Sequence, residues 1–307
     1  RNRDVNNLSE QGIKIKFSDE EYTEIATALN FDKYINRTKD LFNNNWAFWS
    51  EGTVTLGEID NTSLASLQEI QTTGITIGVD KKVTDRRMYG FALRVGLDDV
   101  DIGTSGTNLK TDMFSLSSYA TFPFNNKTFI DTNLGISSLK IDSKRKHEAG
   151  FLDGKRNGNQ IFGSIVYGGE FIKKDLNISP YGRIDLGYTI LDEYLESGKI
   201  SALKYNKMKI ENSKSSLGFL INNSYEINNL KFKPFSRFEY GRGSTDSNDT
   251  IVSYYKAYPN TNYTNKGENK SSDNYRVTIG TDLDIGKNMF YTASFERNEE
   301  IDSGYTN

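Results

Sequence analysis

The sequence predicts an all-β fold, a transmembrane antiparallel β-barrel preceded by an α-helix. Two observations lead to this prediction. Apolar residues recur at every second position in eleven segments, and the links between the segments alternate between short and long. Composition agrees, because only 36% of the 307 residues are hydrophobic although Phe and Tyr number 18 each. A soluble domain with a large closed core usually has about 45–50% apolar residues, whereas a thin apolar outer face needs fewer.

The first element is a helix. Ser18 is a suitable N-cap, and Glu21 stands three residues later as its capping-box partner. Apolar residues then recur at roughly helical spacing over 19–42, so we assign residues 19–44 to this helix and residues 1–18 to a polar segment before it. The polar face of the helix carries three cations, which are Lys33, Arg37 and Lys39.

From Trp46 onward the period changes to two. The run from Tyr89 to Leu97 places an apolar residue at every odd position, with small or charged residues between them. Eleven such segments are visible, and we assign residues 45–307 to the barrel. Single-chain bacterial barrels have an even number of strands. We therefore expect twelve strands, with the last one truncated in this chain, which we interpret as an excerpt of a longer protein.

The links between strands are sorted by length. The short links are Thr84–Arg86, Asn125–Lys127, Lys173–Asp175, Asn228–Asn229 and Gly286–Lys287. The long links are polar, and they cover roughly residues 58–68, 99–109, 142–158, 192–208, 243–272 and 298 onward. Short turns on one side and long loops on the other are typical of outer-membrane barrels, whereas soluble β-sandwiches have Greek-key links.

Alternation also predicts which charged residues face the lumen. Both signs are represented, and the lining is either that of a water-filled pore or a surface that binds the cations of the helix. Asp131, Glu170 and Asp185 are our candidates for contacts with the helix. The predicted lumen-facing charges are Glu51, Asp80, Arg94, Asp131, Glu170, Arg183, Asp185, Arg237, Glu239, Arg276, Asp282 and Glu296.

Composition excludes several function classes. The formal net charge of −3 argues against a nucleic-acid binder. The absence of cysteine excludes disulfide scaffolds, Cys-ligated zinc and thiol catalysis. His147 is the one histidine, so a mechanism or a metal site that needs two histidines is excluded as well. We predict no catalytic residue, no metal and no cofactor.

Four features together resemble a known family. They are the helix at 19–42, the first strand in 46–60, the pair of strands in 74–80 and 89–96, and the expected count of twelve strands. This arrangement is similar to the translocator (β) domain of classical autotransporters, the type V secretion proteins of Gram-negative bacteria.

The resemblance implies a twelve-stranded barrel in the cell outer membrane that holds the helix in its lumen. It also implies export of an N-terminal passenger, with residues 1–18 as the tail of the passenger or as its linker. The implied partners are outer-membrane lipid, the chain's own passenger and the barrel-assembly machinery. The basic stretch Lys144–Lys146, together with Lys155 and Arg156, adds lipopolysaccharide as an expected partner. The domain is expected to be a monomer and not an enzyme.

Two other functions remain open at this point. The chain could be a porin-like diffusion channel that is plugged by its N-terminal helix. It could instead be an adhesin whose long loops, above all 243–272 with its tyrosines, bind a surface partner.

Overall fold

The structure, a computed structural model, describes residues 46–59, 66–84, 87–148, 150–227, 230–256, 261–265, 269–284 and 290–302. The predicted linker at 1–18 and the predicted helix at 19–44 lie outside these residues. None of the described residues belongs to a helix with the length and hydropathy that crossing a membrane requires.

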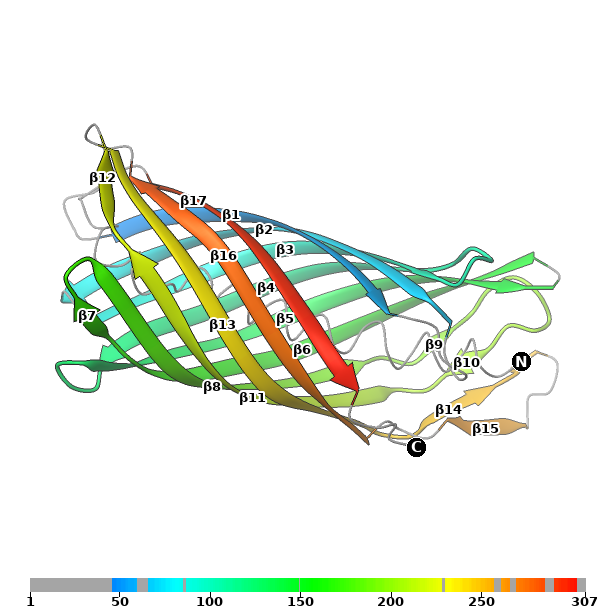
Figure 1. Cartoon of the computed structure of the whole chain (residues 1–307). Helices are drawn as coiled ribbons and strands as arrows, with labels where there is room; N and C mark the ends of the chain where they lie inside the picture. Colours follow the sequence, from blue (N-terminus) through cyan, green and yellow to red (C-terminus); the bar gives the residue numbers. More distant parts are fainter. Residues whose placement is uncertain are drawn as a thin grey trace.

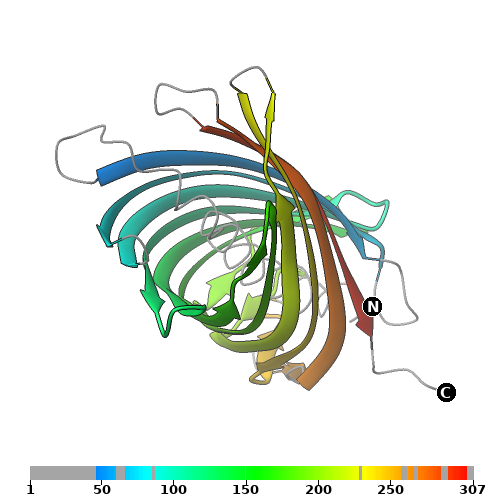
Figure 2. The same cartoon turned by 60° about the vertical axis from the view of Figure 1, so that its left-hand side comes forward.

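Eleven long strands in the described part form one antiparallel sheet, in which each strand pairs with the next long strand along the chain. This order confirms the predicted all-β meander. The sheet curls around a common axis, and β1 and β17 are the two ends of the pairing order (Figures 1 and 2). The long strands are β1 (Trp46–Ile59), β2 (Gln68–Thr84), β3 (Arg87–Ile102), β4 (Thr107–Pro123), β5 (Thr128–His147), β6 (Gly150–Gly169), β8 (Leu176–Leu191), β11 (Met208–Asn223), β13 (Leu230–Ser247), β16 (Asn269–Asp284) and β17 (Phe290–Asp302).

Short strands lie at the two ends of the sheet. β7 (Phe171–Lys173) and β12 (Tyr225–Ile227) pair beside the short turns at one end. A second sheet of four strands lies at the opposite end, where the long links are (Figure 1). Its members are β9 (Tyr194–Leu195), β10 (Lys204–Tyr205), β14 (Thr250–Ser253) and β15 (Asn262–Asn265).

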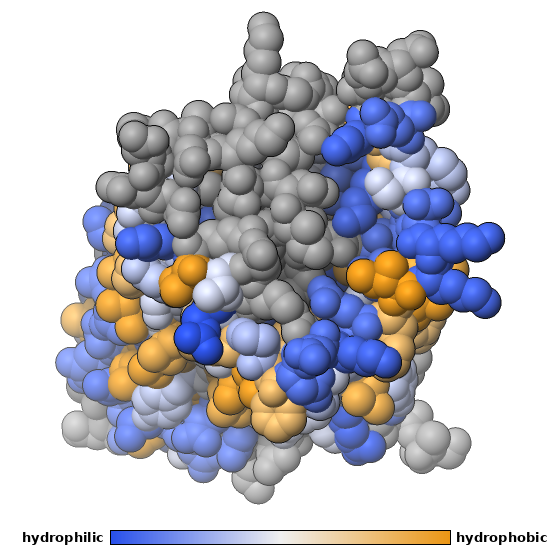
Figure 3. Space-filling model, turned by 90° about the vertical axis from the view of Figure 1, so that its left-hand side faces the viewer, coloured by the Kyte–Doolittle hydropathy of each residue, from blue (hydrophilic) through white to orange (hydrophobic). Residues whose placement is uncertain are grey.

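The middle of each long strand is apolar outside and polar inside. On β5 the outward residues Leu134 and Ile136 are 58% and 57% exposed, whereas the inward Asn133 and Ser137 are buried. Figure 3, which looks onto the end with the short turns, shows apolar residues in orange along the visible outer side. Such an apolar band is what a bilayer requires of the outer face of a sheet.

Towards the long links the polarity of the two faces reverses. On β5 the outward residues become Lys140 and Asp142, while the inward Leu139 is 0% and Ile141 3% exposed. We call the resulting cluster of buried apolar residues the loop-end core. Its members are Ile70, Val100, Ile102, Leu109, Met113, Leu139, Ile141, Leu191, Met208 and Ile210.

Three of the predicted long loops are wrong, because the structure has strands in them. The segment 142–158 is not a loop, because β5 continues to His147 and β6 begins at Gly150. The predicted links 192–208 and 243–272 likewise contain the short strands of the second sheet. Their polar composition suggested loops, yet the period of two continues through β5 and β6 with its polar face turned to water.

Aromatic rings on the inward face lie over glycines of neighbouring strands. A Cβ atom on Gly135 of β5 would overlap the ring of Phe162 on β6, and one on Gly78 of β2 would overlap the indole of Trp49 on β1. Glycine is required at these positions because only a residue without a side chain lets the ring lie flat against the sheet.

Candidate functional site: the inward wall of the sheet

The predicted lumen-facing charges lie along the inward face of the curled sheet. Glu51, Glu170, Asp282 and Glu296 are half-buried. The remaining ones are at most 8% exposed, and they are Asp80, Arg94, Asp131, Arg183, Asp185, Arg237, Glu239 and Arg276. Buried charges are costly unless they are paired or hydrogen-bonded. The partners of these charges therefore determine which of them are neutralised within the inward face of the sheet, which we call the inward wall.

The largest cluster of paired charges centres on Arg276 of β16. Its Nη1 lies 3.3 Å from Oε1 of Glu239 on β13, and its Nε lies 3.1 Å from Oε1 of Glu296 on β17. The Tyr181 hydroxyl on β8 donates to Oε2 of Glu239 at 2.9 Å, and the Thr278 hydroxyl donates to Oε2 of Glu296 at 2.9 Å. The cluster thus spans four strands and holds two carboxylates around one guanidinium group.

A second pair lies within a single strand. Nε of Arg183 donates to Oδ1 of Asp185 at 2.8 Å, and both side chains are 3% exposed. The two residues are two positions apart on β8 and therefore share a face. On β3, Nη1 of Arg94 donates to the Thr76 hydroxyl at 3.3 Å. The wall therefore carries charges that are held in fixed positions.

A chain of aromatic hydrogen bonds crosses the wall near β1, and sequence reasoning missed it. Nε1 of Trp49 donates to the Tyr119 hydroxyl at 2.7 Å, and that hydroxyl donates to Oδ2 of Asp80 at 3.2 Å. The available signal was parity, because Tyr119 falls on the same face of β4 as the inward Ser115 and Ser117. Our sequence interpretation did not single out Tyr119.

The three acidic candidates for helix contacts have different surroundings. Asp185 binds Arg183, as described above. Asp131 is 2% exposed on β5, and Glu170 follows β6 with its backbone N–H donating to the Lys127 carbonyl at 2.8 Å. Their expected cationic partners Lys33, Arg37 and Lys39 lie outside the described residues. Contact between the helix and these carboxylates stays a prediction.

The second sheet is held to the β5–β6 hairpin by a buried ion pair. Nε and Nη2 of Arg145 donate to the two carboxylate oxygens of Glu196 at 2.8 and 2.5 Å. The backbone N–H of Leu203 also donates to Glu196, at 3.0 Å. Burial alone would lower the pKa of Arg145, but the hydrogen bonds and charge of Glu196 raise it above its usual value.

The basic stretch that suggested lipopolysaccharide binding is therefore divided between two faces. Arg145 points inward, while Nζ of Lys144 and of Lys146 lie 4.4 and 4.5 Å from the ring centroid of Phe151. Arg156 is also buried, and its Nε donates to the Asp192 carbonyl at 2.6 Å. Lys155 points outward and lies 3.4 Å from Asp142. Fewer cations thus reach the surface than the sequence suggested.

The inward wall is built for contact with a polar chain or with water. In the part of the chain that the structure describes, no group of three or more His, Cys, Asp or Glu residues could hold a metal ion. Several of its hydroxyls and charges bind one another, either within a strand or across neighbouring strands. Paired charges of this kind support a fixed polar surface rather than proton transfer or nucleophilic attack.

Comparison with known proteins agrees with this architecture. The family described as autotransporter beta-domain matches residues 48–296. Among solved structures, the β domain of the Bordetella autotransporter BrkA superposes with a TM-score of 0.63 at 15% identity, covering 84% of this chain and 93% of that one. The translocator domain of the autotransporter NalP from Neisseria meningitidis gives 0.56 at 13% identity, with 93% and 98% covered. No curated protein matches the chain in sequence.

Proposed function

Because this chain belongs to the autotransporter β-domain family, we propose that its curled sheet closes as a twelve-stranded barrel around the helix at 19–44. The chain is a translocator domain of the outer membrane, and the family implies a passenger of its own. The proposal adds the position of the helix, the complete strand number and the path of the passenger. The observation that carries it is the meander of eleven long strands with an inward wall of charged and polar residues.

Electrostatics supports a helix in the lumen. Lys33, Arg37 and Lys39 recur on one face of the predicted helix. The inward wall offers Asp131 and Glu170 away from the Arg276 cluster and the Arg183–Asp185 pair. A buried carboxylate gains from a nearby cation, so a helix with this face would be held in a defined orientation. The helix would then restrict the passage of ions.

The same proposal covers the remaining partners. The apolar band would contact outer-membrane lipid as a monomer, and assembly would depend on the barrel-assembly machinery. Contacts with lipopolysaccharide would rest on the outward Lys144, Lys146 and Lys155 rather than on the whole basic stretch.

The deciding experiment uses the full-length autotransporter with an epitope tag inserted just upstream of Arg1. Antibody binding to intact cells is expected, because the N-terminal side of the barrel would have crossed the membrane. A tag that is detected only after the outer membrane is permeabilised would place the N-terminus in the periplasm and favour a plugged porin. Deletion of residues 19–44 gives a second readout, and a bilayer conductance equal to that of the parent would contradict a lumenal helix.

A further inference from the structure

The loop-end core is an apolar surface inside the lumen, on the side of the long links. Its members come from β2, β3, β4, β5, β8 and β11, and each is at most 5% exposed. Met113 pairs with Leu139 on the next strand. Leu139 and Leu191 meet over Gly158, where an added Cβ atom would lie 3.4 Å from the first and 2.6 Å from the second. The core thus runs along the inward face from β2 round to β11.

The tips of these side chains need a cover that their own strands do not provide. Side chains of one sheet stand roughly perpendicular to it, so they cover the flanks of their neighbours and leave the tips open. Yet Leu139, Leu191, Met208 and Ile210 are 0% exposed. The second sheet keeps its buried apolar residues in a cluster of its own. Complete burial of the loop-end core therefore calls for an apolar segment on the lumen side.

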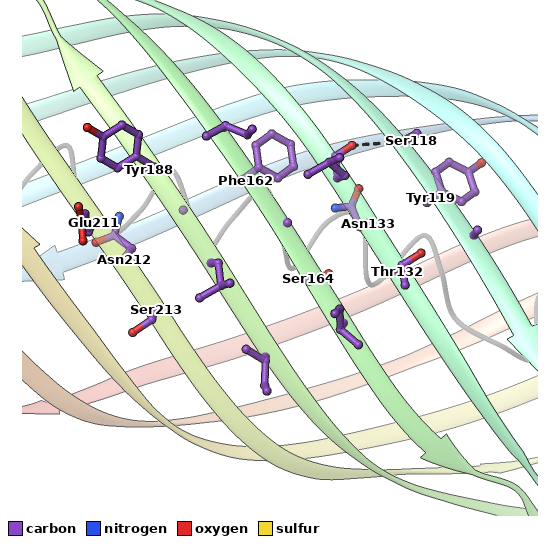
Figure 4. A pocket seen from close by; sticks show the side chains of 18 of the residues that line it. Ser118, Tyr119, Thr132, Asn133, Phe162, Ser164, Tyr188, Glu211, Asn212 and Ser213 are labelled. Atoms are coloured by element: carbon purple, nitrogen blue, oxygen red, sulfur yellow. Dashed lines mark hydrogen bonds between the residues drawn. The ribbon is translucent and has the colours of Figure 1, made fainter. Parts of the chain in front are cut away.

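The inward wall between the core and the short turns is polar. Figure 4 shows Asn133 between Phe162 and Tyr119, on three neighbouring strands. Asn133 and Ser137 are buried polar residues on the short-turn side of Leu139. A segment that fills the lumen would therefore match the wall only if it is apolar beside the core and polar or charged further down.

The predicted helix at 19–44 has this division. Tyr22, Ile25, Ala26 and Leu29 follow the spacing i, i+3, i+4, i+7, which places them on one face of a helix. The three cations of the segment come later, from residue 33 to residue 39. The strand that follows, β1, begins close to a short turn, because its first residue pairs with Lys81 near the end of β2. The cationic half would therefore lie towards the short turns and the apolar half towards the long links.

The lengths agree as well. Ile25 is nineteen residues before the end of the predicted helix, which is about 28 Å at 1.5 Å per residue. Leu139 is eleven residues beyond Thr128, the first residue of β5. At 3.4 Å per residue and a tilt of about 35–45°, it lies about 26–31 Å along the barrel axis. The same reckoning places both Lys39 and Asp131 about 8 Å from the short-turn end.

We propose that the loop-end core is the binding surface for the apolar face of residues 22–29. The inference rests on the proposed lumenal helix and goes beyond its charged contacts, because it names a second, apolar contact at the mouth and sets Ile25 level with Leu139. The contact would form a dry seal where the barrel stands in water. Apolar constrictions of this kind block the passage of ions.

Disulfide cross-linking in the full-length autotransporter tests the contact. The 307 residues contain no cysteine, so that introduced thiols are the only ones in this domain. I25C is combined in turn with V100C, L139C and M208C, which lie on β3, β5 and β11 around the core. At least one pair should cross-link in outer membranes treated with an oxidant. T27C, on the opposite face of the predicted helix, is the matched control and should cross-link with none of the three.

The reaction of a single thiol with a charged maleimide tests the seal. L139C should react slowly in the otherwise unchanged chain. I25N/L29N should raise the rate by about tenfold or more, because the loss of two buried apolar contacts favours an open mouth. E24N/T27N places the same two polar residues on the opposite face and should leave the rate unchanged. Surface display of the passenger shows that each variant has been assembled.

Deletion of residues 19–44 separates this inference from the proposed lumenal helix. If the deletion raises the conductance but I25C forms no cross-link to the core, the helix is in the lumen and the apolar contact is overturned. Equal rates of L139C with and without I25N/L29N would overturn the seal, since another part of the chain would then cover the core. If the deletion leaves the conductance unchanged, the lumenal helix is contradicted and the inference falls with it.

Discussion

The two halves of β5 place their apolar residues on opposite faces although they belong to one continuous strand. We call the half beside the short turns the lower half and the half beside the long links the upper half. In the lower half Leu134 and Ile136 face outward and Ser137 faces inward, whereas in the upper half Lys140 and Asp142 face outward and Leu139 faces inward. The backbone is the same in both halves, so the difference lies in the solvent around them. Lipid surrounds the first half, and the second half stands in water, where apolar residues must gather inside. The comparison shows that a membrane boundary can be located by where alternation changes phase.

The largest expected effect comes from the ion pair that fixes the second sheet to the upper half. Substitution of Arg145 by Met would leave Glu196, whose side chain is 1% exposed, without its cation. Removal of one partner from a buried pair costs about 3–5 kcal/mol. Urea titration in lipid vesicles, combined with proteolysis of the 192–207 segment, measures the loss. The exposed neighbour provides the control, since K144M should change stability little; equal behaviour of R145M and K144M would show that the pair is not structural.

The loop-end core predicts an effect of nearly the same size. L139A should lower the free energy of unfolding by about 2–5 kcal/mol, because Leu139 is fully buried and its truncation leaves a cavity. L134A, on the outward face of the lower half, should cost less because lipid chains fill the space that is vacated. The same urea titration compares the two variants. If L134A lowered the free energy of unfolding more than L139A does, the loop-end core would not stabilise the upper half.

A lysine scan along the outward face of β5 locates the boundary directly. L134K should destabilise the folded state by about 2–4 kcal/mol, as a cation does near the middle of a bilayer, whereas S138K should cost about 0–1 kcal/mol. Both positions are on one strand and one face, which makes the pair a matched test of depth. Similar costs at the two positions would place the boundary somewhere other than between Ile136 and Ser138.

The smallest expected effect concerns surface charges of the upper half. Nζ of Lys110 lies 2.9 Å from Oδ2 of Asp99. Burial tends to raise the pKa of Asp99, but hydrogen bonds from Lys110 and Asn108 outweigh it, and the pKa lies below its usual value. A lowered pKa stabilises the fold above the unfolded-state pKa, and this stability is lost as the pH falls through the folded-state pKa. D99N should therefore cost about 0.2–1 kcal/mol at pH 7, and this cost should shrink as the pH falls through the folded-state pKa of Asp99. A cost that is independent of pH would assign it to packing.

Sequence alone predicted the elements better than the contacts between them. The period of two is a local property, so the strands and the meander could be derived from residues such as those of 89–97. The partners of Arg276 depend on register across β13, β16 and β17, which no single segment contains. The ends of β5 and β6 were wrong because charged outward residues such as Lys144 and Lys155 were interpreted as part of a loop. The inward Leu139 and Ile141 continue the alternation of apolar and polar residues along β5, and this alternation was a sign in the sequence that the strand goes on.

The ring of Phe162 over Gly135 has a consequence for how this domain changes in evolution. Any side chain at position 135 would meet the ring, so that position is free to vary only when residue 162 becomes smaller in the same lineage. Among relatives of this chain, the two positions should therefore covary, glycine with an aromatic residue and a larger residue with a small one. Such correlated substitution would reveal the pairing of β5 with β6 without any structure.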